Sequence, residues 1–258
     1  MNTYETSLRR AYALLNLDRN IAGVRLLKTE EDFEKAPGIV TPKPMNYCLM
    51  VASATKGHVI KAKETNIKCR SGVRVLGINP ADPLNGNGEN WARLGLYKDS
   101  EISRQVRKEL SYVTEKHTGV VVGDAYRLEE IDVFIIVANA YSCMRILQGY
   151  AYSYGMPHQI NMLGNQALCL ECTARPYVTG DINLSMLCIG TRHRANWADH
   201  EMAVGIPAER FETVINGIYQ TANIMESNAN KQRIAQHFSE LPNDTIQLQQ
   251  NYNYYMDC

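Results

Sequence analysis

Cysteine is the residue type in this chain whose spacing points to chemistry. Cys169 and Cys172 stand three residues apart in a segment that we predict to be helical, so both sulfurs fall on one helix face. Cys188 and His193 follow, and the resulting C-x2-C-x15-C-x4-H pattern approximates the ligand spacing of a zinc site except at its last pair. The pattern predicts a metal site.

Two further cysteines, Cys48 and Cys69, extend this candidate set into the first half of the chain. Four thiolates suit an iron–sulfur cluster, although neither of the compact cysteine runs of ferredoxins is present. The predicted cofactor is therefore an iron–sulfur cluster or zinc. The predicted metal ligands, with Cys172 as an alternate, are Cys48, Cys69, Cys169, Cys188 and Cys172.

Two metal-free interpretations compete with this one. The cysteines could be inert thiols that pack as small apolar side chains among their leucine and methionine neighbours. Alternatively, Cys188 could act as a catalytic nucleophile that is activated by positive charge from Arg192, His193 or a helix N-terminus. In the metal-binding interpretation, Arg192 and Arg194 are predicted to receive an anionic small molecule.

Other catalytic and nucleotide-binding motifs are not supported. His200 and Glu201 suggest a zinc-protease motif, but position 204 is valine rather than the second histidine. The chain has no Walker A sequence and no Gly-x-Ser-x-Gly elbow. Residues 80–97 show little periodicity, and a loop of this length is often functional. This loop, with Trp91, could line the pocket of a non-catalytic binding module.

The apolar spacing predicts alternating helices and strands and hence an α/β or α+β fold, with a mixed sheet and flanking helices. The predicted helices cover residues 1–17, 47–54, 69–76, 103–112, 141–154, 166–173, 207–225 and 230–241. The predicted strands cover residues 21–27, 58–62, 119–122, 132–137, 158–162 and 182–189.

A possible internal repeat relates residues 20–78 to residues 131–190. In each copy a strand precedes a helix with a cysteine, a glycine, a short strand and a second cysteine, which pairs Cys48 with Cys143 and Cys69 with Cys169. Two similar halves would then pack together with cysteines at their interface. Residues 1–258 are predicted to form one domain that ends in the C-terminal helices of residues 207–241 and a loose tail, 245–258.

The composition is that of an ordinary globular protein. Lysine plus arginine equals aspartate plus glutamate at 27 each, so nucleic acid is not an expected partner. The N-terminal segment lacks the apolar region of a signal peptide, and no run of roughly 18 apolar residues follows, so we expect a cytoplasmic protein without a membrane span. A homo-oligomer is left open. Seven cysteines in a reducing compartment are expected to be thiols, ligands or nucleophiles rather than disulfides.

Two stretches of the chain resemble the bacterial and archaeal family known as domain of unknown function 169. One is the run from Cys69 to Gly77, CRSGVRVLG, and the other comprises LSMLCIGTR, which ends at Arg192, and DHEMAVGIP, which ends at Pro207. The similarity runs over residues 21–218. The resemblance implies a cytoplasmic protein of largely anaerobic prokaryotes and supplies no established activity.

The resemblance also implies which cysteines form one set. The family motifs are a helix with a cysteine near its start, Cys-x-x-Gly followed by Leu-Gly, Ala-x-Cys, and Cys-x-Gly-x-Arg. In this chain they fall on Cys48, Cys69, Cys169, and Cys188 with Arg192, whereas Cys172 is an addition. We therefore expect a cysteine-ligated metal or iron–sulfur protein with a redox or cofactor-metabolism role. A thiol enzyme using Cys188 and a small-molecule binding module are the alternatives.

Overall fold

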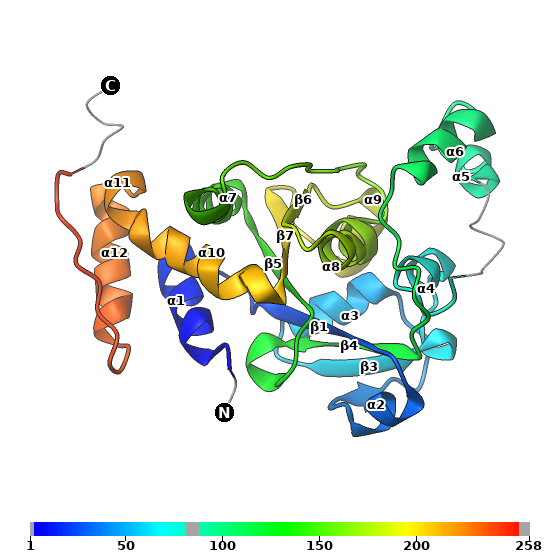
Figure 1. The fold of residues 1–258 in the computed structure, drawn as a ribbon, viewed down its shortest axis with the longest axis horizontal. Helices are drawn as coiled ribbons and strands as arrows, with labels where there is room; N and C mark the ends of the chain where they lie inside the picture. Colours follow the sequence, from blue (N-terminus) through cyan, green and yellow to red (C-terminus); the bar gives the residue numbers. More distant parts are fainter. Residues whose placement is uncertain (1–2, 81–87, 253–258) are drawn as a thin grey trace.

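A seven-stranded sheet forms the centre of the protein, and the computed structural model describes residues 3–80 and 88–252 (Figure 1). The strands lie in the order β2-β3-β4-β1-β5-β7-β6. Only β2 and β3 pair in parallel, and the other neighbours are antiparallel, so the predicted mixed sheet with flanking helices is confirmed. The strands are β1 (Ala22–Leu27), β2 (Ile39–Val40), β3 (Val59–Lys63), β4 (Gly119–Asp124), β5 (Val133–Asn139), β6 (Asn183–Ser185) and β7 (Glu201–Pro207).

Helices cover both faces of this sheet because its central strands are apolar on both sides. On β5, Val133 and Ile135 enter one core whereas Phe134 and Ile136 enter the other. The helices are α1 (Glu5–Leu15), α2 (Glu30–Lys35), α3 (Tyr47–Ala54), α4 (Arg70–Val75), α5 (Glu89–Arg93), α6 (Ser100–Lys108), α7 (Ala140–Tyr154), α8 (Arg175–Thr179), α9 (Ile189–Ala195), α10 (Ala208–Gln220), α11 (Ala222–Met225) and α12 (Asn228–Ser239), with the 3-10 turns η1 (Glu64–Asn66) and η3 (Ala125–Arg127) and the π-helix η4 (Ala167–Ala174).

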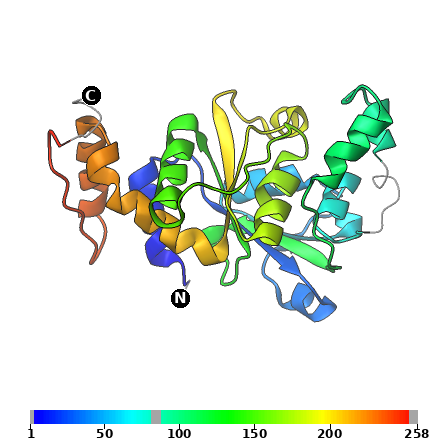
Figure 2. The same ribbon diagram turned by 45° about the horizontal axis from the view of Figure 1, so that its top comes forward.

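The two helical layers have different partners. Helices α1, α7, α10 and α12 share one core, and α3, α4 and η4 share the other. Figures 1 and 2 show α7 and the segment of η4 and α8 on opposite sides of the strands. Helices α7 and α10 cross closely, because a Cβ atom at Gly217 would lie 2.0 Å from the carbonyl oxygen of Gly149.

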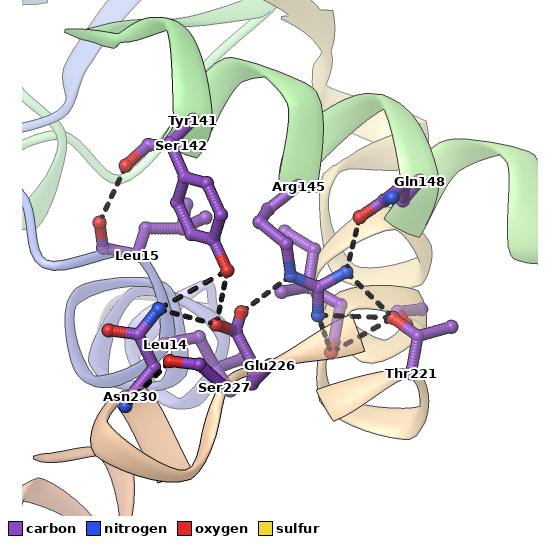
Figure 3. Close-up of polar contacts among 12 residues, drawn as sticks. Leu14, Leu15, Tyr141, Ser142, Arg145, Gln148, Thr221, Glu226, Ser227 and Asn230 are labelled. Carbon is purple, nitrogen blue, oxygen red and sulfur yellow. Dashed lines mark hydrogen bonds and ion pairs between the residues drawn. The ribbon is translucent and has the colours of Figure 1, made fainter. Parts of the chain in front are cut away.

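A buried ion pair attaches the C-terminal helices to α7 (Figure 3). The Arg145 Nε atom donates to the Glu226 carboxylate at 2.5 Å, and both side chains are 1% exposed. Tyr141 and Asn230 donate to the other oxygen of Glu226, and Arg145 also donates to Thr221. The network is fully hydrogen-bonded, as a buried charge pair must be to persist.

Several predicted elements were wrong. Residues 158–162 form no strand, and the strand predicted over 182–189 is only β6, because α9 already begins at Ile189. Strand β7 was missed: six of its seven residues are buried, so it shows no alternation of apolar and polar residues. Within residues 80–97, 81–87 lie outside the described residues, and α5 follows them.

Single side-chain contacts reach the C-terminal tail as far as Tyr252, and the looseness of residues 245–258 stays a prediction. The buried Lys231 ammonium donates to the carbonyl groups of Gln249 and Tyr252. The Gln249 amide donates in turn to the Asn223 side chain at 2.7 Å. Sequence periodicity could not show this, because these are single side-chain contacts to an irregular backbone.

Both halves of the sheet follow the same strand order. Counted outward from the central antiparallel pair of β1 and β5, one half runs β1, β4, β3 and the other β5, β7, β6, and every neighbouring pair among them is antiparallel. This arrangement corresponds to an approximate twofold axis between β1 and β5. The duplication of the sequence itself stays a prediction.

No helix in residues 3–80 and 88–252 is both long enough and apolar enough to span a bilayer.

Candidate functional site

Four cysteines from distant parts of the chain line one cavity of about 320 Å³. We call Cys48, Cys69, Cys169 and Cys188 the four cavity cysteines. Cys169 is buried, with 8% exposure, and the other three are half-buried. The cavity is thus open to small molecules at one side and closed by the core at the other.

Three of these cysteines lie at the beginnings of helices. Cys69 is the N-cap residue of α4, Cys188 is the N-cap residue of α9, and Cys48 is the second residue of α3. The N–H groups of a first helical turn have no acceptor within their own helix. They can donate to sulfur, which favours the thiolate form over the neutral thiol in a bound state.

The fourth, Cys169, lies on the π-helix η4, all of whose residues are buried. The Glu171 N–H donates to the Gln166 carbonyl five residues earlier, at 3.4 Å, which is the hydrogen-bond spacing of a π-helix. The Tyr47 hydroxyl is 2.8 Å from the Thr173 hydroxyl, which ties η4 to α3. π-Helical turns are rare and frequently occur at functional sites.

The sulfurs are close enough to influence each other's ionisation. Burial raises the pKa of Cys169 well above its usual value, and Cys69, Cys188 and Cys48 raise it further. Burial also raises the pKa of Cys48; a hydrogen bond from Thr191 opposes this, and Cys188 and Cys69 reinforce it. The site therefore resists accumulating negative charge unless a cation binds between the sulfurs.

A single metal ion and a cluster require different arrangements of the four sulfurs. Among the described residues, no three His, Cys, Asp or Glu side chains are placed so that they could hold one ion. Zinc would require its sulfurs at about 2.3 Å from a common centre. A cluster requires a wider arrangement, because its irons and inorganic sulfides lie between the cysteine sulfurs.

The remaining wall of the cavity is apolar with a few polar atoms. Trp91, Leu94 and Leu96, from the segment 80–97, line it. Asn165 and Gln166 also line the cavity, and the Asn165 Nδ2 and Gln166 Oε1 atoms are buried without a hydrogen-bond partner. Unpaired buried polar atoms are uncommon and call for a ligand or water.

The other predicted site residues lie elsewhere or have other contacts. Cys172 does not belong to the described lining; its thiol is buried near Glu171 and Cys143. His193 is exposed and is likewise absent from the lining. Arg194 does line the cavity.

Arg192 anchors the cysteine turn rather than facing the cavity. Its guanidinium donates to the carbonyl groups of Met186, Ala198 and Glu201 at 2.6–2.8 Å. These bonds join the segment before Cys188 to the start of β7. The arginine of the Cys-x-Gly-x-Arg motif therefore has a positioning role, and of the two predicted arginines Arg194 is the one that the described lining of the cavity contains.

The strand order relates the cavity cysteines in pairs that differ from the predicted repeat. Cys69 and Cys188 both cap the helix that follows the outer strand of a half, β3 or β6. Cys48 and Cys169 both lie on the helix that precedes this strand. Cys143, the residue predicted to match Cys48, lies on α7 in the opposite core, where burial raises its pKa to about 12.

Sequence reasoning missed the amides of Asn165 and Gln166. Neither residue belongs to a motif, and Gln166 is unusual only in its left-handed backbone, with φ of 55°. No signal in the sequence could have found them, because their role depends on the turn that precedes the π-helix.

Comparison with known proteins finds a family model and a relative, both described as uncharacterised. A family model described as uncharacterised ArCR matches residues 12–217. The chain is similar to "Uncharacterized protein MJ0308" of Methanocaldococcus jannaschii, with 23% identity over 222 residues, covering 84% of this chain and 94% of the relative. No solved structure matches.

Proposed function

The chain belongs to the DUF169 family, and from the geometry of its cavity we propose that it binds an iron–sulfur cluster through the four cavity cysteines. The observation that carries the proposal is the convergence of four thiols, from both halves of the sheet, on one cavity. Soft thiolate ligands select iron–sulfur clusters, zinc or copper(I) over hard cations. The absence of any histidine or carboxylate from the described lining favours an all-sulfur centre.

A redox or cofactor-metabolism role follows from the exposure of the site. Three of the four cavity cysteines are half-buried, so a bound cluster would lie close to solvent. Electrons could then pass to a partner or to a molecule in the cavity without crossing the core. The same lining offers no general base for Cys188 as a metal-free nucleophile, because no histidine or carboxylate lies there in the described residues.

Metal analysis of anaerobically purified protein tests this proposal. The wild-type chain is expected to carry iron and acid-labile sulfide and to absorb broadly at about 400 nm, as thiolate-bound clusters do. Replacing any one of the four cavity cysteines by serine, for example Cys169→Ser, is expected to lower the iron content per chain by about tenfold, because one ligand is lost.

Two cysteines serve as matched controls for this series. Cys143→Ala and Cys172→Ala also remove thiols, but neither sulfur lines the cavity, so both variants are expected to keep the iron content of the wild type. A chain that takes up neither iron with sulfide nor zinc under these conditions would refute the proposal. One zinc ion per chain, lost in the same four serine variants, would leave a thiolate centre but exclude the cluster.

A second proposal concerns an anionic small molecule bound beside the centre. Arg194 lies at the exposed side of the lining, and the unpaired Gln166 Oε1 and Asn165 Nδ2 atoms lie deeper. We expect citrate or succinate to raise the melting temperature of the protein, and Arg194→Gln to abolish that shift. Equal stabilisation of wild type and variant would show that these anions bind elsewhere.

A further inference from the structure

Arg107, in the last turn of α6, is a buried cation for which the described residues offer no anionic partner. Its exposure is 6%, and its three guanidinium nitrogens have no partner at full hydrogen-bond geometry, although the Tyr112 hydroxyl is close enough for a weak hydrogen-bonding contact. Burial lowers the pKa of Arg107, the neighbouring Tyr112 partly offsets this, and Arg74 lowers it further. A buried charge without compensation costs several kcal/mol in an effective low dielectric, so this arrangement demands an explanation.

The contacts of Arg107 place it next to the cavity. Its guanidinium carbon lies 4.6 Å from the ring centre of Trp91, which lines the cavity, and 5.8 Å from the ring centre of Tyr112. Tyr112 packs against the core that contains Cys169, and the ionisation of its hydroxyl is influenced by both Arg107 and Cys169. The Trp91 ring therefore contacts the guanidinium and also lines the cavity that holds the cysteines.

A thiolate-bound centre has the charge that this cation lacks. Four thiolates bring four negative charges, and the irons and sulfides of a cluster, or a zinc ion, offset only part of them. Reduction of a cluster adds a further negative charge. A cation held behind aromatic rings interacts strongly with such a centre, because water cannot screen it there.

We propose that Arg107 is the buried counter-charge of the four-cysteine centre, an inference that rests on the proposed function. Arg107 is a positioning residue in this account: it touches no ligand and acts through the field at the cysteines. It favours the bound, negatively charged centre and the reduced form of a cluster. In the metal-free protein it is a destabilising residue.

Three variants test the inference. Arg107→Met removes the charge and keeps an unbranched apolar side chain, Arg107→Lys keeps the charge, and Arg93→Met removes an arginine that is 80% exposed on the adjacent helix α5. Each protein is loaded with iron and sulfide without air. The midpoint potential, the rate of metal loss to a chelator, and the thermal unfolding of the metal-free form are then measured.

Arg107→Met is expected to shift the one-electron reduction equilibrium about tenfold toward the oxidised form. This corresponds to a midpoint potential about 59 mV more negative than that of the wild type. Metal loss to the chelator should be roughly tenfold faster, while the metal-free variant unfolds at or above the wild-type temperature because an uncompensated charge is gone. Arg107→Lys should retain most of the wild-type midpoint potential and most of the wild-type resistance to metal loss, because the charge is kept. Arg93→Met should match wild type, since exposed charges are screened.

The outcomes separate this inference from the proposed function. If Arg107→Met matches Arg93→Met in potential and in chelator rate, Arg107 is not the counter-charge, although the centre stands. A metal-free Arg107→Met protein that is less stable than wild type would indicate a structural role and also overturn the inference. If the wild type binds zinc alone, there is no reduction potential to measure, and the rates of metal loss to the chelator decide whether Arg107 is the counter-charge. A wild type without any metal centre overturns both.

Discussion

Glu226→Ala is expected to lower the free energy of unfolding by about 3–5 kcal/mol, which is typical for breaking a buried ion pair from one side. The substitution leaves the Arg145 guanidinium buried, with 1% exposure, and without its carboxylate (Figure 3). The hydroxyl of Tyr141 and the amide of Asn230 lose their acceptor as well. Urea unfolding followed by circular dichroism measures the effect.

Two further variants give this prediction its controls. Tyr141→Phe removes the hydrogen bond to Glu226 at 2.7 Å and the longer one from Asn230 at 3.2 Å but leaves the ion pair in place, and is expected to cost about 1 kcal/mol. Combining Glu226→Leu with Arg145→Met removes both charges and should recover much of the loss, because no unpaired charge remains buried. A Glu226→Ala protein within about 1 kcal/mol of wild type would contradict the claim that this pair holds α11 and α12 to α7.

Gly205→Ala is expected to cost about 3 kcal/mol, the upper end of the usual range for overpacking, and also to disturb the cysteine site. An added Cβ atom at Gly205, on β7, would lie 2.3 Å from the carbonyl oxygen of Cys172 and 2.7 Å from its Cα atom. The obstacle is backbone rather than a flexible side chain, so η4 has to move away from the sheet. Cys169 belongs to that element, and the metal content per folded chain should therefore fall.

The matched control is alanine at a glycine that has room. A Cβ atom at Gly72, in α4, would lie 3.7 Å from the Cβ atom of Tyr47, an ordinary contact. Gly72→Ala should leave stability unchanged or raise it by up to about 1 kcal/mol, because alanine favours the helix. Because Gly72 lines the cavity and its Cβ atom would lie 3.9 Å from that of Cys69, this variant controls for stability and not for metal content. Glu226→Ala supplies the second control, since it destabilises the opposite layer and should leave metal content per folded chain unchanged. If Gly205→Ala keeps full metal content, η4 tolerates the shift and our account of its rigidity is wrong.

The helices were the most predictable part of the fold. Tyr47–Ala54 was predicted as a helix with the bounds that the structure has, because apolar residues at helical spacing are followed by a glycine. The central strands β1, β4 and β5 were found from their β-branched residues. Strand β7 was missed, since residues that are buried on both faces carry no periodic signal, and β6 was found but predicted five residues too long.

The candidate site divides in the same way. The sequence alone determined the local properties of the site, namely the four cavity cysteines and their positions near helix starts. It also determined the balanced charge and the mixed α/β class. The meeting of these cysteines at one cavity depends on strand order, which pairs residues more than a hundred positions apart and leaves no mark in local spacing. Only the tertiary structure decided that Cys172 lies outside the cavity, that Arg192 binds backbone, and that Arg107 is buried, because each depends on which neighbour a side chain meets once the layers have packed.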